Sequence, residues 1–269
     1  MASRLVIVPT PIGNLADVTL RALDALRQAD AVACEDTRHT AKLLRHYQIK
    51  TPLLRLDQHT MDRAARLLRE YKYLAYASDA GTPGISDPGA ELVSIALQLG
   101  VSVEVLPGAT ALIPALVVSG LPTARFVFEG FLPQSGKARR DRLEALARER
   151  RTIVLYESPH RLQKTLSELA AVFGSEHEVA VVREISKKHE EVWRGSLRGA
   201  GEHYGNPRGE FVLVLAGAAA VEKESGGLQE LEASLKKHGL SGRALAEALE
   251  AAGLSRNEAR KRAYQKEER

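Results

Sequence analysis

The stretch Ser78-Asp79-Ala80-Gly81-Thr82-Pro83-Gly84-Ile85-Ser86-Asp87-Pro88-Gly89 connects a β-prone run, 73–77, to an apolar run of helical character, 90–99. Its glycines allow positive φ or close approach to a ligand, and its prolines stiffen the path. Asp87 is expected to cap the next helix, with Pro88 as its first residue. Such a cluster is often only a turn, but a connection this long at the end of a strand favours ligand binding. No Gly-Lys-Ser/Thr follows, so a nucleoside triphosphate is disfavoured.

The first 120 residues alternate short β-prone runs with stretches that have helical spacing. A second turn-rich loop, 9–14, also precedes a helix, which suggests that the two loops share one pocket. The alternation predicts a mostly parallel sheet with helices on both faces and a site at the carboxyl edge of the strands. The expected strands are 4–8, 31–34, 53–56, 73–77 and 101–105.

The second half changes pattern, because its strands are separated by fewer helices. This indicates a smaller α/β domain with antiparallel pairing at its end. A linker rich in small residues, 216–227, leads to a tail with helical stretches broken at Gly239 and Gly253. We therefore expect an α/β protein with domains 1–120 and 121–217 and a small helical domain, 228–269.

The composition bears on whether the protein spans a membrane, forms disulfides or binds a metal. The chain has 269 residues, of which 44% are apolar and 27% charged, and no apolar run approaches the ~20 residues that span a bilayer. The single cysteine, Cys34, cannot form an internal disulfide, and the histidines are too scattered for a metal site. We expect a cytoplasmic protein with neither a membrane span nor a metal.

Basic residues gather in two segments, although the net charge is only +4. Each segment is either a solvated face or a nucleic-acid contact. Ser255 and Glu258 have the spacing of a capping box that opens a basic helix, so the tail resembles a helix-turn-helix or a helical cap. The two segments contain Lys137, Arg139, Arg140, Arg142, Arg148, Arg150 and Arg151, and Arg256, Arg260, Lys261, Arg262 and Lys266.

Charged clusters follow several strands. Glu35-Asp36-Thr37-Arg38 offers a general base and an anion clamp, although Asp36 could simply cap a helix and Arg38 could pair with a neighbour. Tyr156-Glu157-Ser158-Pro159-His160-Arg161 and Arg183-Glu184 repeat the arrangement in the second domain, which indicates a cleft. Carboxylates and backbone groups suit a cofactor with a ribose, an amino-acid head group and a sulfonium. The residues alone thus predict a two-domain small-molecule transferase or binder.

An ordered series of motifs resembles the tetrapyrrole methylase superfamily, and more closely its branch of ribosomal RNA small subunit methyltransferase I proteins. The resemblance covers nearly all of the first 217 residues. Besides 78–89 and Glu35 to Arg38, it rests on Thr10-Pro11-Ile12-Gly13-Asn14-Leu15, Pro107-Gly108, Ser119-Gly120-Leu121-Pro122, Gly130-Phe131-Leu132-Pro133, Tyr156 to Arg161, Arg183-Glu184 and Gly209-Glu210-Phe211-Val212. This chain departs from the family pattern at Asp57-Gln58-His59-Thr60 and at Ile185-Ser186-Lys187-Lys188.

The resemblance implies two α/β domains with S-adenosylmethionine between them, a homodimer, and 2′-O-methylation of cytidine 1402 in the 16S rRNA of the 30S ribosomal subunit. Glu35 or Asp36 is then the base or orienter, and Arg38 an anion clamp. The rival functions are a precorrin-type tetrapyrrole methyltransferase and a non-catalytic RNA-binding protein that senses a metabolite. The residues expected at the cofactor are Pro9, Asp79, Gly81, Thr82, Ile85, Ser86, Thr110, Ala111, Tyr156, Glu157 and Leu213.

Overall fold

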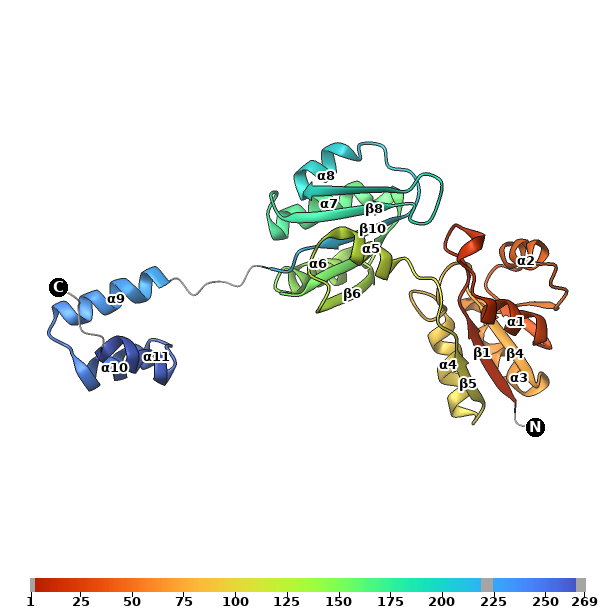
Figure 1. The fold of residues 1–269 in the computed structure, drawn as a ribbon, viewed down its shortest axis with the longest axis horizontal. Coiled ribbons are helices and arrows are strands. Elements are labelled where there is room, and N and C mark those ends of the chain that lie inside the picture. Colours follow the sequence, from red (N-terminus) through yellow and green to blue (C-terminus); the bar gives the residue numbers. More distant parts are fainter. Residues whose placement is uncertain (1–2, 219–224, 265–269) are drawn as a thin grey trace. The chain divides into compact units, whose positions relative to one another are not determined.

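The computed structural model describes residues 3–218 and 225–264, which belong to two compact units, 1–218 and 219–269. The first unit contains two five-stranded sheets, coloured red to yellow and yellow-green to blue-green (Figure 1). The second unit is helical. Within the described residues, no helix is both long enough and apolar enough to cross a lipid bilayer.

The first sheet is entirely parallel, as the alternation predicted. Its strand order is β3-β2-β4-β1-β5, so β1 and β4 are central neighbours. These central strands are buried on both faces, which is typical of a parallel sheet covered by helices. The strands are β1 (Arg4–Val8), β2 (Ala31–Cys34), β3 (Leu53–Arg55), β4 (Tyr73–Ala77) and β5 (Ser102–Val105).

Helices cover both faces of this sheet, which confirms the prediction. Leu26 and Leu43 pack on one face from α1 and α2, while Leu68 and Leu92 pack on the other from α3 and α4. Two short 3-10 turns lie in the connections. The elements are η1 (Leu15–Asp17), α1 (Leu20–Gln28), α2 (Thr37–His46), η2 (Gln58–Arg63), α3 (Ala64–Glu70) and α4 (Gly89–Gln98).

The second sheet is mixed, with strand order β6-β7-β10-β8-β9. Only β6 and β7 are parallel; the other three pairs are antiparallel, as expected from the sparse helices. Its strands are β6 (Phe126–Phe131), β7 (Thr152–Glu157), β8 (Glu178–Arg183), β9 (Glu191–Ser196) and β10 (Phe211–Leu215).

The second sheet is also covered on both faces. Leu146, Leu166 and Leu197 pack on one face from α6 (Gly136–Leu146), α7 (Pro159–Phe173) and α8 (Leu197–His203). On the other face, Leu112 and Leu116 pack from α5 (Leu112–Ser119). This helix precedes residue 120 yet packs on the second sheet. The domain boundary at residue 120 stays a prediction.

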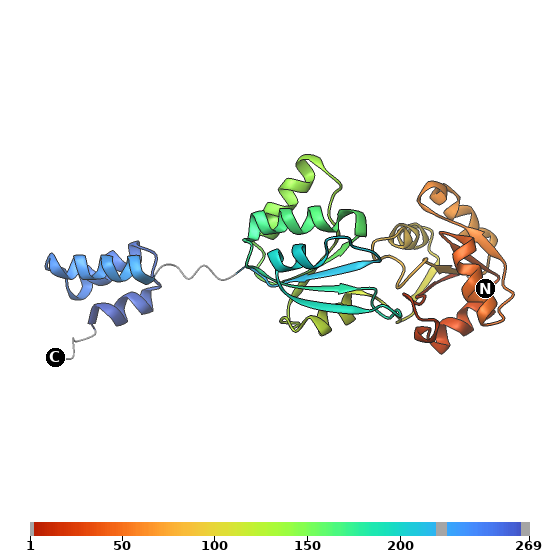
Figure 2. The ribbon, with the colours of Figure 1, turned by 90° about the horizontal axis from the view of Figure 1, so that it is seen from above.

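The helical unit contains α9 (Ser225–Lys237), α10 (Gly242–Ala251) and α11 (Arg256–Tyr264), drawn in blue (Figure 2). Leu245 and Leu249 of α10 are buried and pack against Ala259 of α11. The Ser255 hydroxyl accepts a hydrogen bond from the Glu258 amide at 3.4 Å and donates one to the Glu258 carboxylate, so the cap forms without the full reciprocal pair. Lys266 lies outside the described residues.

Candidate functional site

Two loops at the carboxyl edge of the first sheet are joined to each other. Thr10 and Gly81 exchange two backbone hydrogen bonds, of 2.9 and 3.0 Å. The Thr10 hydroxyl also donates to the Ser78 carbonyl at 3.0 Å. Gly81 has φ +80°, in the left-handed region that favours glycine. The pairing joins the loops 9–14 and 78–89, and residues of both line the cavities described below, as expected.

The second half of the 78–89 loop folds around one carboxylate. Asp87 Oδ1 accepts hydrogen bonds from the Gly84 and Gly89 amides, both at 2.7 Å. Helix α4 begins at Gly89 with Pro88 as its N-cap, so the expectation that Asp87 is the N-cap and Pro88 the first helical residue is wrong by one position. Asp87 still binds the start of the helix, because the Gly89 amide that donates to it belongs to the first helical residue.

A cavity of about 440 Å³ lies against this loop, and both sheets contribute to its wall. Its size suits a drug-sized or cofactor-sized ligand. Of the residues expected from the sequence, ten lie in the wall: Glu35, Asp79, Gly81, Thr82, Ile85, Ser86, Thr110, Ala111, Tyr156 and Glu157. The structure therefore brings together residues that are distant in the sequence.

The other expected cofactor residues lie outside this wall. Pro9 packs against Gly108, where an added Cβ would stand 2.3 Å from the Pro9 Cβ. Leu213 is fully buried in the core beneath α6, α7 and α8. Its neighbour Val212 lines the cavity and packs in the core on the opposite face of the sheet.

Glu35 is the carboxyl group whose chemistry the cavity changes most. Partial burial, with the nearby negative charges of Asp87 and Asp79, raises the pKa of Glu35 to about 7. A carboxyl with such a pKa can accept and release a proton near neutral pH. The position of Glu35 at the end of β2 makes it a candidate general base.

Asp36 and Arg38 pair with each other outside the cavity wall. Their side chains are 2.8 Å apart, and the Arg38 side chain is 88% exposed. Hydrogen bonds from Arg38 hold the pKa of Asp36 well below its usual range. Asp36 is also the N-cap of α2, so the capping and pairing roles considered for this motif are both present. Their roles in catalysis stay predictions.

Glu157 is part of the cavity wall, and its carboxylate is hydrogen-bonded to residues of the same domain. Its carboxylate accepts hydrogen bonds from the Thr165 hydroxyl at 2.6 Å and from the Ser158 amide at 2.8 Å. Arg161 stands 3.4 Å from it. Tyr156 stacks edge-on against Phe128 and Phe131. These contacts make a rigid, partly aromatic wall on the side of the second sheet.

Several wall residues were not singled out from the sequence as cofactor contacts, namely Ile12, Phe131, Ile185, Lys187, Glu210, Phe211 and Val212. Phe131 carries a detectable signal, because it is an aromatic residue at a strand end inside a quoted motif. Lys187 forms ion pairs of 2.8 and 2.7 Å with Glu184 and Glu210. The positive charge of Lys187 is therefore already balanced by these two glutamates.

A smaller cavity of about 260 Å³ lies beside the first. Its wall comes from the 10–15 loop, from α2 and from the start of the 78–89 loop. Ser78 and Asp79 line both cavities. Nothing in the local sequence signals this second cavity, because three separate segments form it. Among the described residues, no cluster of three His, Cys, Asp or Glu is placed to hold a metal.

The basic segment around α6 is not a uniformly solvated face. The Arg139 side chain is only 3% exposed and pairs with Glu168 at 2.6 Å, while also donating to Thr165 and to the Pro133 carbonyl. Arg142 pairs with Glu129. The expectation that Arg139 contacts solvent or RNA is wrong, since the helix turns this side chain inward against α7.

Comparisons with known proteins agree with this architecture. The sequence model of the family described as Tetrapyrrole (Corrin/Porphyrin) Methylases matches residues 4–200. The crystal structure of uroporphyrin-III C-methyltransferase from Thermus thermophilus complexed with S-adenosyl homocysteine has a TM-score of 0.60 at 22% identity, covering 80% of this chain and 92% of that one. That likeness establishes the fold.

Closer relatives carry one shared name. The ribosomal RNA small subunit methyltransferase I of Synechocystis sp. is 48% identical over 238 residues, covering 86% of this chain and 85% of the relative. The protein of the same name from Bacillus subtilis is 42% identical over 270 residues, covering 97% and 92%. From these matches and the two-sheet fold, the chain belongs to the tetrapyrrole methylase family, in the branch of the ribosomal RNA small subunit methyltransferase I proteins.

Proposed function

We propose that this protein transfers the methyl group of S-adenosylmethionine to the 2′-hydroxyl of cytidine 1402 in the 16S rRNA of the 30S ribosomal subunit. The observation that carries the proposal is the larger cavity. It combines carboxylates at the edge of a parallel sheet with a partly aromatic wall from the second sheet. The names of the relatives support methylation of small-subunit ribosomal RNA.

The residues in the cavity fit the proposed cofactor. Glu35, Asp79 and Asp87 give the wall negative charge, which suits a sulfonium and an ammonium group. The one lysine in the wall, Lys187, is already paired with two glutamates. Gly81 has a positive φ, and a Cβ there would stand 3.3 Å from Ile12, so a larger residue at this point of the wall would be strained.

Asp79, Gly81, Thr82, Ile85 and Ser86 would hold the cofactor from the first sheet. Thr110 and Ala111 would hold it from the later turn, and Tyr156 and Glu157 from the second. Pro9 and Leu213 stay predicted contacts, through the backbone in the case of the buried Leu213. S-adenosylmethionine supplies a methyl group made electrophilic by the positively charged sulfur.

The residues of the chain would orient the ribose and remove its proton. Glu35, with a pKa raised to about 7, would accept the proton of the 2′-hydroxyl when that hydroxyl is methylated. Arg38, whose side chain is exposed, would clamp a phosphate, and Asp36, which pairs with it, would orient it. Alignment of the hydroxyl with the methyl group can itself lower the barrier by several kcal/mol.

We also propose that the protein acts as a homodimer in the cytoplasm. Ile113 and Val117 of α5 are 43% and 66% exposed, which is compatible with a covering second copy. Sedimentation at micromolar protein concentration tests the dimer: a single species at twice the chain mass is expected, and a monomer would contradict it.

The decisive experiment offers labelled S-adenosylmethionine with each of two substrates. The first is 30S subunits that lack the modification, and the second is a free tetrapyrrole. We expect label in the 16S rRNA, mapped by nuclease digestion and mass spectrometry to the ribose of cytidine 1402. Label on the tetrapyrrole alone would replace the proposal with the tetrapyrrole methyltransferase. Binding of RNA without any transfer would indicate a non-catalytic protein.

A further inference from the structure

The smaller cavity has the composition of a nucleotide site. Its 260 Å³ is just under the roughly 300 Å³ at which pockets for drug-sized ligands begin, so its ligand should be smaller than the cofactor. Pro11, Leu15 and Leu43 supply apolar surface to it. Lys42 supplies a cationic group to the wall, and His39 supplies an imidazole. Apolar surface for a base and a cation for a phosphate are the two elements of nucleotide recognition.

The two cavities meet at one segment of chain. Ser78 and Asp79 lie at the end of β4 and belong to both walls. Hydrogen bonds fix their position: the Thr10 hydroxyl donates to the Ser78 carbonyl, and the Asp36 amide donates to the Asp79 carboxylate. Ligands in the two cavities would therefore both contact Ser78 and Asp79.

The charge of α2 favours an anion at this place. Its sequence, Thr-Arg-His-Thr-Ala-Lys-Leu-Leu-Arg-His, contains cations and no acid. Arg38 is matched by Asp36, but within the described ranges 3–218 and 225–264 neither His39 nor Lys42 has an ion-pair partner. Both side chains belong to exposed residues, and their spacing of three places them on one face of the helix.

From this geometry we propose that the smaller cavity holds the target nucleoside, and that Lys42 and His39 bind the adjoining RNA phosphate. The inference rests on the proposed function, since it names where the RNA substrate of that reaction binds. The base lies against the apolar wall, and the ribose is presented at Ser78 and Asp79 to the methyl donor in the larger cavity. Recognition of the phosphate positions the nucleotide without reading its sequence.

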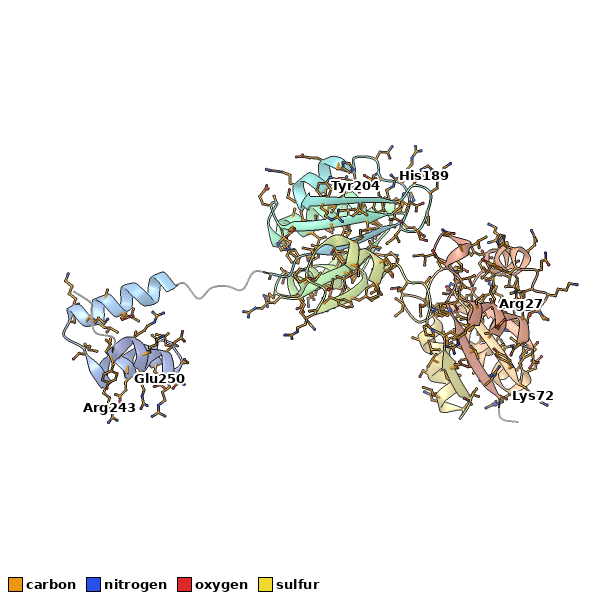
Figure 3. All side chains as sticks on the ribbon, viewed as in Figure 1. Arg27, Lys72, His189, Tyr204, Arg243 and Glu250 are labelled. Atoms are coloured by element: carbon orange, nitrogen blue, oxygen red, sulfur yellow. The ribbon has the colours of Figure 1, made fainter. Side chains whose placement is uncertain are left out.

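Two variants and one control test this site. Lys42→Gln removes the phosphate contact, and Leu15→Trp fills the cavity from a position that is 39% exposed, so the fold should tolerate it. Lys72→Gln is the matched control, because Lys72 precedes β4 at the amino end of the first sheet (Figure 3). The measurements are the KM for undermodified 30S subunits, kcat, the salt dependence of binding to them, and the affinity for S-adenosylmethionine by calorimetry.

We expect both variants to raise the KM for 30S subunits severalfold while the affinity for S-adenosylmethionine is unchanged. In Lys42→Gln the slope of log K against log salt should become shallower by about 0.7, the value for one phosphate contact to a single strand. Lys72→Gln should match the wild type in all measurements.

The failure of this inference can be told apart from failure of the proposed function. If the wild-type protein does not methylate 30S subunits, the proposed function fails. If it does, but Lys42→Gln and Leu15→Trp keep the wild-type KM and salt slope, only the nucleotide site is overturned. Loss of cofactor affinity in Leu15→Trp, equal to its loss of activity, would also overturn it, because the two cavities would then not hold separate ligands.

Discussion

Asp79 Oδ1 accepts a hydrogen bond from the backbone amide of Asp36, over 3.1 Å. The bond joins the ends of two neighbouring strands, since β2 and β4 pair in register up to Cys34 and Ala77. It also fixes Asp79 near Glu35, whose pKa that carboxylate helps to raise. One side chain thus supports the loop, lines both cavities and tunes the candidate base.

Substituting Asp79 separates these roles. Asp79→Asn keeps an oxygen for the Asp36 amide but removes the charge, so the pKa of Glu35 should fall towards its usual value and affinity for the cationic cofactor should weaken. Asp79→Ala should also lose about 1 kcal/mol of stability through the missing hydrogen bond. Calorimetric titration with S-adenosylmethionine and chemical unfolding measure the two effects. Wild-type cofactor affinity in both variants would remove Asp79 from the binding site.

The pH dependence of methylation distinguishes Glu35 from Asp36. Because a base must be deprotonated and the pKa of Glu35 is about 7, the single-turnover rate should rise with pH and level off above 7. Glu35→Gln should be slow and should lose this inflection. Asp36→Asn should retain it, since the pKa of Asp36 is held far below the tested range. An inflection that survives in Glu35→Gln would assign it to another group.

The pattern of the sequence predicts most of the first sheet and the loop, because alternation and glycine-rich turns are local signals. Leu213 shows the limit of motif resemblance: the motif locates the strand, but it does not tell that the Val212 side chain lines the cavity while the Leu213 side chain is buried in the core. Strand alternation decides between the two faces only once the position of the sheet is known. The smaller cavity is formed by segments from three parts of the chain, so no local pattern announces it.

Arg139 shows that a run of basic residues does not reveal which of their side chains are exposed. A run of arginines predicts an exposed basic face, yet only the tertiary contact between α6 and α7 turns Arg139 inward. Arg139→Ala should cost roughly 2 to 3 kcal/mol, because charged hydrogen bonds are lost and Glu168 loses its partner. Arg140→Ala, at an exposed position of the same helix, should change stability by less than about 0.5 kcal/mol. Unfolding in urea compares them, and equal stability of both variants would contradict the buried role.

We predict that the helical unit supplies a further contact for RNA. Arg256, Arg260 and Lys261 of α11 are exposed, whereas Arg262 pairs with Glu232 of α9. Replacing the three exposed cations with glutamine should weaken binding of 30S subunits and flatten its salt dependence, because fewer counterions are released. Cofactor affinity should be unchanged, since the cavity that we assign to the cofactor lies within residues 1–218.

Arg243→Gln is the control for this prediction, because Arg243, labelled on α10 in Figure 3, is exposed and already pairs with Glu247. It should bind 30S subunits as the wild type does. Circular dichroism of each variant establishes that the three helices remain folded, so that a loss of RNA binding reports the charge and not the fold. If the triple variant keeps the wild-type salt slope, α11 is a solvated face and the helical unit serves a purpose other than docking RNA.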